Sequence, residues 1–369
     1  MKFGMLHLFE NPRGRTEEQV IKEQSELMVA AEDYSFDSIW PAEHHFTEYG
    51  YCASPGMSLA AVAAQTKRIR LGTGIVVLPL NHPLRVAEDY AFLDLLSDGR
   101  VELGVGRGYQ PLEFERYGVD QATTRGRFAE ELAIIKSAWT DEVVNFHGEF
   151  YDFTDVPVRP KPKQDPHPRI WMAALSPETF ELAGQMGCEL LYGSVFGLTP
   201  DAAAQRRNDY YRGLIAGGHP AEGRRTGCLT MVYVADTMEQ AIADFREPVS
   251  WYYQKIAKYL AKPGDETVPS YETYNRFRDV ALSADYDALV ELRHVVVGPP
   301  DHVIEHLTEI QGQYGFTDML CWTRLGGLAT DKVLRSMELM HEHVIPALRD
   351  AEPPTPDLEE IAASVVSSD

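Results

Sequence analysis

The sequence has few basic residues, few cysteines and no long apolar run. Its 369 residues include 34 Lys and Arg against 56 Asp and Glu, which gives a net charge of −22. Nucleic-acid phosphates and anionic lipids bind basic surfaces, so this charge argues against both as partners. No apolar run approaches the roughly 18 residues of a membrane helix, and the apolar stretch at the N-terminus is too short for a signal peptide. We therefore expect a cytoplasmic protein with no nucleic-acid or membrane partner.

Patterns typical of disulfide frameworks and metal sites are also missing. The four cysteines stand far apart in the chain, at Cys52, Cys188, Cys228 and Cys321. This spacing predicts neither a disulfide framework nor a CxxC metal site. His302, Glu305 and His306 match the HxxEH pattern of some zinc peptidases. They fall on an amphipathic segment far from the expected strand ends, so we interpret them as a solvated helix face and expect no metal.

Short apolar segments alternate with longer amphipathic ones along most of the chain. The short segments are apolar on both faces and rich in β-branched and aromatic residues, which is typical of buried parallel strands. We expect strands at 2–8, 38–41, 69–78, 101–105, 170–173, 190–194, 228–235 and 316–322. Eight β/α units in succession predict a single α/β domain, a (β/α)8 TIM barrel, with a doubly wound open sheet as the competing fold.

Two insertions and a tail interrupt this alternation. Residues 142–164 contain a hairpin expected to turn at His147-Gly148, and they form an insertion after the fourth strand. Residues 261–293 have few periodic apolar positions, so we expect a mobile insertion after the seventh strand. Long insertions at strand ends often act as lids, and the sequence leaves open whether this one does. We divide the chain into a barrel domain, 1–349, and an acidic C-terminal tail, 350–369.

Several helix ends are readable from the sequence. Thr16 and Gln19 form a capping-box pattern, and Gly99 after Asp98 predicts the end of a helix near residue 96. Ser176 and Thr199 each place a hydroxyl directly before a proline, as expected at the start of a helix.

Residues that can take part in catalysis or binding stand where the expected strands end, which is where a barrel carries its active site. After the second strand comes Glu43-His44-His45. Imidazole titrates near neutral pH, so a histidine here can act as a general base. Neighbouring residues of an extended chain point in opposite directions, so the two histidines are poorly placed to share a metal ion. The alternative is that both simply bond to the backbone of the loop.

A glycine-rich stretch follows the fourth strand, and a serine and a threonine follow the fifth. Glycines before Arg107 allow the backbone to approach a flat or phosphorylated ligand, and the arginine suits a phosphate. If Ser176 caps a helix, Thr179 lies in its first turn, and the free N–H groups there attract phosphate. The ends of the fourth and fifth strands are neighbours in a barrel, so one phosphate can contact residues from both. The alternatives are a glycine-rich turn with a surface arginine and an ordinary helix cap.

These motifs resemble the bacterial luciferase-like family of flavin-dependent monooxygenases, in its FMN-using branch. The resemblance runs from residue 1 to about residue 348. Its markers are the sequences EHHFTE at 43–48, GTGIVVLP at 72–79, NHP at 81–83, LLSDGR at 95–100, GVGRG at 104–108 and GPPD at 298–301. The closing strand at 317–322 also fits.

The resemblance implies a barrel that holds reduced FMN at its strand ends. It implies that Arg107, Ser176 and Thr179 contact the flavin phosphate, and that His44 is the active-site histidine. The Gly74-Ile75 bond matches a position where the family has a non-proline cis peptide beneath the flavin ring. We expect Tyr109, at the end of the glycine-rich stretch, to contact the cofactor as well.

The resemblance also implies a two-component reaction. No pyridine-nucleotide fingerprint is present, so a separate flavin reductase is expected to supply reduced FMN as a cosubstrate. Dioxygen would add to it to form a flavin peroxide, one oxygen atom would enter a small organic substrate, and His44 would move the proton. The family is often dimeric, so a homo-oligomer is expected.

The sequence departs from luciferase at two positions. Luciferase has cysteine where this chain has Gly106, and glutamate where it has Leu175. Reactive-thiol behaviour and light emission from an aldehyde are therefore not expected. Two other functions remain open: a deazaflavin-dependent hydride-transfer oxidoreductase, and a non-catalytic flavin-binding subunit. The sequence does not identify the substrate.

Overall fold

A computed structural model describes residues 1–260, 268, 271–283 and 285–366. The strands are β1 Lys2–His7, β2 Ser38–Pro41, β3 Arg70–Gly72, β4 Val76–Val77, β5 Val101–Gly106, β6 Val144–His147, β7 Asp152–Val156, β8 Arg169–Ala173, β9 Glu189–Gly193, β10 Thr226–Val234, β11 Val295–Gly298 and β12 Asp318–Cys321. The helices are α1 Glu17–Ala30, α2 Pro55–Ala63, α3 Pro83–Leu96, α4 Pro111–Tyr117, α5 Thr124–Thr140, α6 Pro177–Gln185, α7 Pro200–Ala216, α8 Met238–Tyr259, α9 Glu272–Ser283, α10 Tyr286–Glu291, α11 Pro300–Tyr314, α12 Thr330–Leu339, α13 Ile345–Leu348 and α14 Leu358–Val366.

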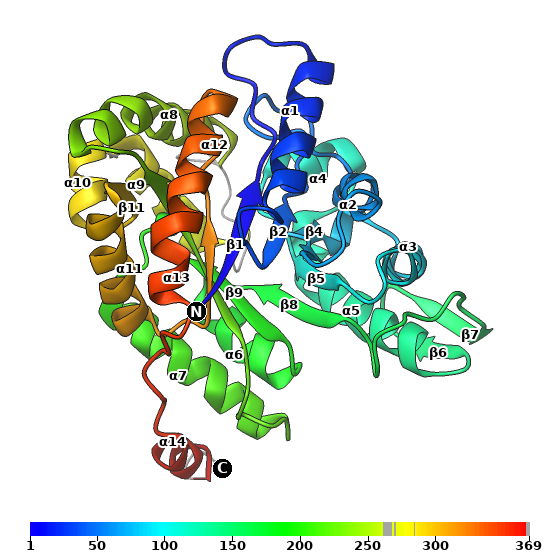
Figure 1. The fold of residues 1–369 in the computed structure, drawn as a ribbon. Helices are drawn as coiled ribbons and strands as arrows, with labels where there is room; N and C mark the ends of the chain where they lie inside the picture. The colour runs from blue at the N-terminus through cyan, green and yellow to red at the C-terminus, as the bar shows by residue number, and fades with distance from the viewer. Residues whose placement is uncertain (261–267, 269–270, 284, 367–369) are drawn as a thin grey trace.

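The sheet closes into a parallel barrel surrounded by helices (Figure 1). Its strand order is β1-β2-β3-β5-β8-β9-β10-β12, and β12 pairs with β1 in parallel, with Gly4 opposite Leu320. This closure confirms the predicted TIM barrel and excludes the open sheet. Each of the eight expected strand segments overlaps one of these strands. β11 is an additional strand that the sequence did not predict, and it pairs with the second half of β10.

Local sequence explains why the elements begin and end where they do. Every residue of β5 is buried, which matches its apolar character on both faces. The capping box is confirmed, because the Thr16 hydroxyl accepts from the Gln19 N–H (3.2 Å) and the Gln19 side chain accepts from the Thr16 N–H (3.0 Å). Thr199 caps α7 as expected, and α3 ends before Gly99, whose φ is 83°.

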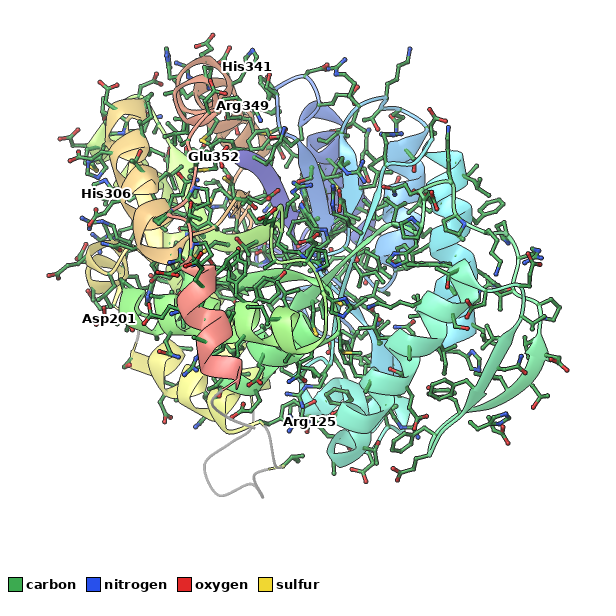
Figure 2. The ribbon with its side chains drawn as sticks, turned by 90° about the horizontal axis from the view of Figure 1, so that it is seen from below. Arg125, Asp201, His306, His341, Arg349 and Glu352 are labelled. Atoms are coloured by element: carbon green, nitrogen blue, oxygen red, sulfur yellow. The ribbon has the colours of Figure 1, made fainter. Side chains whose placement is uncertain are left out.

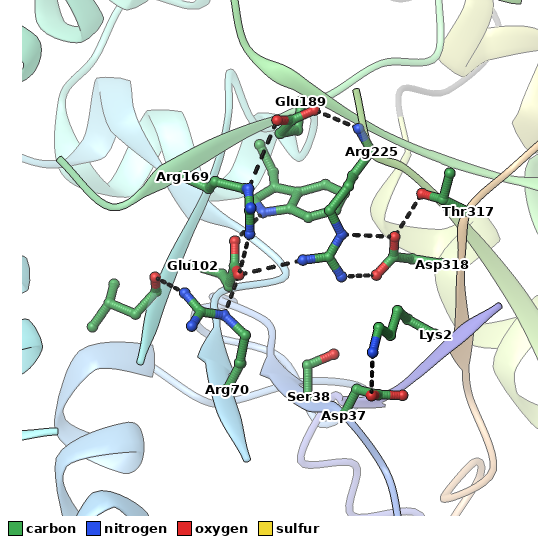
Figure 3. A network of polar contacts seen from close by, with 12 residues as sticks. Lys2, Asp37, Ser38, Arg70, Glu102, Arg169, Glu189, Arg225, Thr317 and Asp318 are labelled. Carbon is green, nitrogen blue, oxygen red and sulfur yellow. Dashed lines mark hydrogen bonds and ion pairs between the residues drawn. The ribbon is translucent and has the colours of Figure 1, made fainter. Parts of the chain in front are cut away.

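A buried glutamate ties together the end of the barrel opposite the strand C-termini (Figure 3). Glu102 of β5 is 1% exposed and accepts a hydrogen bond from the Trp171 indole N–H at 2.7 Å. Guanidinium groups of three arginines from β3, β8 and the start of β10 also contact its carboxylate: Arg70, Arg169 and Arg225. These contacts join four strands that are far apart in the sequence.

Additional segments extend the barrel. A hairpin of β6 and β7, with residues 148–151 at its turn, lies between α5 and β8. Helices α8, α9 and α10 follow β10, and the segment 261–267, expected to belong to a mobile insertion, lies outside the described residues. The tail carries α14, which packs against α7. Arg349, seen from below in Figure 2, pairs with Asp37 at 2.5 Å, and its carbonyl accepts from the N-terminal ammonium.

In the described part of the chain, no helix is both long and apolar enough to cross a membrane.

Candidate active site

A cavity opens at the C-terminal ends of the barrel strands. It encloses about 1200 Å³ including its mouth, and residues from most of the strand ends line it. All of the site residues expected from the sequence are among them: His44, Gly74, Ile75, Arg107, Tyr109, Ser176 and Thr179. The structure therefore brings together residues that the sequence places more than a hundred positions apart. A cavity at this position is typical of a ligand site in a barrel.

Part of the cavity wall is bare backbone. The Gly74-Ile75 peptide bond, at the position that the resemblance indicated, is cis. Gly106 faces it closely, because a Cβ atom there would lie 2.2 Å from the Cδ1 atom of Ile75. Gly108 has φ of 74°, a conformation that side-chain-bearing residues rarely adopt. These glycines line the cavity, and the absence of a Cβ at Gly106 and Gly108 lets the side chains of Ile75 and Val77 pack against their backbone.

The N-terminus of α6 forms another part of the wall. The hydroxyls of Ser176 and Thr179 lie 2.8 Å apart and hydrogen-bond to each other, and both residues are more than 90% buried. Ser176 holds the N-cap position of α6 with Pro177 directly after it, as predicted, but its hydroxyl makes no cap bond to a backbone N–H. Two hydroxyls at the N-terminus of α6 therefore stand at the cavity together, where the helix dipole also favours an anion.

Arg107 lies on the same cavity, directly after β5. Its guanidinium carbon is 5.1 Å from the centre of the Tyr271 ring, which it stacks over. The Tyr271 hydroxyl in turn bonds to the Thr124 hydroxyl at 2.9 Å, which fixes the ring in place. The arginine thus adds a positive charge to a cavity whose α6 side already offers N–H and O–H donors.

His44 lies at the centre of a buried polar cluster. Its Nδ1 atom is 3.1 Å from a carboxylate oxygen of Glu113 and 2.9 Å from the amide of Gln110. Its Nε2 atom is 3.0 Å from the hydroxyl of Tyr49, which is 2.5 Å from the hydroxyl of Tyr109. The ring is 8% exposed, while Glu113 is 1% exposed. Both ring nitrogens therefore have fixed partners.

His45 points away from this cluster, as expected for neighbouring residues. Its Nε2 atom is 3.1 Å from a Glu43 carboxylate oxygen, and its Nδ1 atom is 3.1 Å from the Tyr117 hydroxyl. Glu43 also accepts from the Val77 N–H at 2.8 Å and from the Asn81 amide at 3.0 Å. Glu43 therefore ties the loop after β2 to the segment after β4, and this tie holds one wall of the cavity.

Several residues of the site were not predicted from the sequence. Glu113 and Gln110 belong to the start of α4, more than 60 residues from His44, and no spacing pattern connects them. Tyr49 is close in sequence to His44, but an aromatic residue in a loop carries no signal of its role. Burial raises the pKa of Tyr49 well above its ordinary value, with Tyr109 and Glu113 adding to the effect. Its hydroxyl therefore keeps its proton at neutral pH.

The remaining lining is largely apolar and aromatic. Phe196, Tyr252 and Trp322 line the cavity, and the Tyr252 and Trp322 rings meet edge to face with centroids 4.4 Å apart. Of the aromatic residues near strand ends, Phe196 and Trp322 thus line the cavity, while Phe9 and Trp171 are buried in the core. Leu175, at the position where luciferase has glutamate, also lines the cavity. This part of the wall excludes water and offers no charge.

Comparison with known proteins identifies similar chains. The family model described as luciferase-like monooxygenase matches residues 1–317. The oxygenase component of the flavin-dependent trigonelline monooxygenase of Acinetobacter baylyi is 27% identical, over 95% of this chain and 96% of that protein. The 4-hydroxyprotoasukamycin monooxygenase of Streptomyces nodosus subsp. asukaensis is 32% identical, over 87% of this chain and 85% of that protein.

A solved structure has the same architecture. The crystal structure of monooxygenase RslO1 from Streptomyces bottropensis superposes with a TM-score of 0.80 at 29% identity, covering 94% of this chain and 99% of that one. The similarity thus extends over the barrel and its helices rather than over a few motifs.

Proposed function

This chain belongs to the luciferase-like monooxygenase family, as its motifs indicated, and we propose that it oxygenates a small organic substrate with reduced FMN and dioxygen. One observation carries the proposal. A single cavity joins Arg107 and the start of α6 to the glycine-lined wall beside His44. This combination suits a flat ring that carries a phosphate on a flexible chain.

The chain's own residues fit FMN at each end of the cavity. Arg107, Ser176 and Thr179 would hold the phosphate, and Tyr109 would contact the cofactor beside them. Gly74 and Ile75 would lie against the ring, and Gly106 lines the same cavity. Arginine and helix N-termini both favour phosphate, because the charge and the aligned N–H groups stabilise its negative oxygens.

Reduced flavin, when bound, supplies the two electrons that let dioxygen place one oxygen atom in the substrate and the other in water. The residues of the site provide the rest. His44 takes up or gives the proton that accompanies oxygen transfer. The apolar and aromatic wall, with Phe196 and Trp322, keeps water from the reacting atoms and favours an uncharged, apolar substrate.

A separate reductase is proposed as the source of reduced FMN. The sequence carries no fingerprint for a pyridine nucleotide, so nothing in it predicts that this chain reduces flavin itself. The relative from Acinetobacter baylyi is named as an oxygenase component, which supports a division of the reaction between two proteins.

Oxygen consumption tests this function directly. We would supply reduced FMN through a flavin reductase, record dioxygen uptake with and without a panel of apolar organic compounds, and use ¹⁸O₂ to trace the product. Uptake that depends on the compound, with one labelled oxygen atom in the product, is the expected result. No labelled product from any compound, with uptake unaffected by all of them, would contradict the proposal.

A homodimer is also proposed, through the face formed by α2 and α3, which lie side by side in Figure 1. Met57 of α2 is 74% exposed, and Phe92 and Leu96 of α3 are 57% and 58% exposed. Large apolar side chains grouped on neighbouring helices favour association. Sedimentation of wild type and of Phe92→Glu tests this. The variant should become monomeric, while Leu292→Glu, at another exposed leucine, should not; a wild-type monomer would contradict the proposal.

A further inference from the structure

A chain of polar contacts runs from Glu113 through His44 and Tyr49 to Tyr109. Its links are 3.1 Å from Glu113 to Nδ1 of His44, 3.0 Å from Nε2 to the Tyr49 hydroxyl, and 2.5 Å from that hydroxyl to Tyr109. All four residues line the cavity; Glu113, His44 and Tyr49 are buried, whereas Tyr109 is partly exposed. The chain therefore leads from a buried carboxylate to Tyr109, its most exposed member.

The partners of Glu113 determine where the imidazole proton lies. The same Glu113 oxygen also accepts the backbone N–H of His45 at 2.9 Å, so it faces two donors when Nδ1 of His44 carries a proton. A carboxylate has no proton to give, so Nδ1 of His44 must be the donor in their contact. Nε2 is then unprotonated and accepts from the Tyr49 hydroxyl. The Gln110 side-chain nitrogen lies 2.9 Å from Nδ1 and donates to the Tyr49 oxygen at 2.6 Å, which leaves the Tyr49 proton for Nε2.

Tyr49 is suited to pass a proton on. It is fully buried, and its raised pKa keeps the hydroxyl protonated. Its oxygen lies within hydrogen-bond distance of both His44 and Tyr109. A hydroxyl can donate one proton while it accepts another, so Tyr49 can pass a proton between the two.

We propose that Tyr49 and Tyr109 form a proton relay between His44 and the cavity, and that Glu113 is a positioning residue that fixes the tautomer of His44. Tyr109 is then the group that touches the reacting atoms. The part that this relay plays in flavin chemistry rests on the proposed function. The distances between its residues are those of the flavin-free protein.

The relay conserves protons at every link. When an oxygen in the cavity loses a proton, that proton passes to Tyr109, the Tyr109 proton passes to Tyr49, and the Tyr49 proton passes to Nε2 of His44. Both tyrosines end as neutral phenols, and His44 ends as an imidazolium beside the Glu113 carboxylate. The reverse sequence donates a proton to the cavity. The carboxylate offsets the positive charge of the ring, as in other carboxylate–histidine pairs.

Nitrogen-15 NMR of the flavin-free protein tests the tautomer. Protonated and unprotonated ring nitrogens have well separated shifts, and His44→Gln identifies the signals. We expect Nδ1 protonated and Nε2 unprotonated in wild type, a mixture or the reverse tautomer in Glu113→Gln, and the wild-type pattern again in Glu113→Asp. Protonation of Nε2 alone in wild type would overturn the proposal, as would an unchanged pattern in Glu113→Gln.

The reoxidation of reduced FMN by dioxygen tests the relay without an organic substrate. With protein in excess over FMN, the flavin returns to its oxidised form and dioxygen is reduced to hydrogen peroxide, for which protons must be moved. We expect Tyr49→Phe, His44→Ala and the double variant each to slow this step by about tenfold or more, to the same extent, because residues that act as a unit are not additive.

Two results would overturn the relay: a rate within twofold of wild type in Tyr49→Phe, and losses that multiply in the double variant. Tyr117→Phe is the matched control, because it removes a tyrosine hydroxyl from the neighbouring His45 ring, outside the relay. Its rate should stay within twofold of wild type. If the protein binds no FMN, the proposed function fails, and the NMR measurement still decides whether Glu113 fixes the tautomer.

Discussion

Replacing Arg107 by alanine should weaken FMN much more than riboflavin. The two flavins share the ring and differ in the phosphate, so their comparison isolates the part of the ligand that Arg107 is proposed to bind. The guanidinium is held over the Tyr271 ring at the cavity wall, which limits the side-chain entropy that binding costs.

The size of the effect follows from the contact. A hydrogen bond to a charged group contributes about 1.5–3 kcal/mol, and about 1.4 kcal/mol changes Kd tenfold. Because Arg107 is only half-buried, solvent reduces its effect, and we place the loss near the lower end. We expect the Kd for FMN to rise about 10–30-fold and the Kd for riboflavin to rise less than about threefold.

Quenching of flavin fluorescence measures both dissociation constants in one titration format. Arg127→Ala is the matched control, because Arg127 also stacks over an aromatic ring, Phe150 at 4.9 Å, but does not line the cavity. Its affinity for both flavins should match wild type. Equal losses for FMN and riboflavin in Arg107→Ala would refute the assignment, since the phosphate would then not be what the arginine binds.

Three further outcomes are expected. His44→Ala should lower the yield of oxygenated product by about 10²–10⁴-fold and leave FMN affinity within about threefold, as product analysis and titration would show; lost binding with intact chemistry would contradict its role. Glu102→Gln should lower the free energy of unfolding by about 2–3 kcal/mol in urea titrations, because three arginines lose their carboxylate; a cost below about 1 kcal/mol would argue against this tie. Burial raises the pKa of Glu131 from 4.5 to about 7, so the folded protein keeps a proton that the unfolded chain releases. Stability should therefore fall as pH rises from about 4.5 to 7, and urea titrations of Glu131→Gln should show a smaller fall; equal falls would contradict the shift.

Much of the fold could be predicted because its signals are local. Each barrel strand is a short apolar segment with apolar residues on both faces, and helix caps such as Thr16 need only a few neighbouring residues. Strand ends also carry the site of a barrel, so His44 and Arg107 could be singled out from position and residue type. The cavity brings these residues together as that rule predicts.

Other parts of the site depend on contacts that no local pattern encodes. Glu113 meets His44 only because α4 follows β5 and folds back over the loop after β2. The sequence suggested a capping role for the Ser176 hydroxyl, but a second hydroxyl at Thr179 competes for it within the same turn. β11 was missed because its run of valines directly follows residues that were interpreted as an insertion. Its partner is the C-terminal half of β10.

Paired titrations with FMN and a deazaflavin, each oxidised and reduced, test the central claim most directly. A cavity that serves a two-component monooxygenase should bind reduced FMN in preference to oxidised FMN, and either form of FMN in preference to the deazaflavin. Tight binding of the deazaflavin with none of FMN would contradict the account, because it would assign the protein to hydride transfer instead of oxygen chemistry.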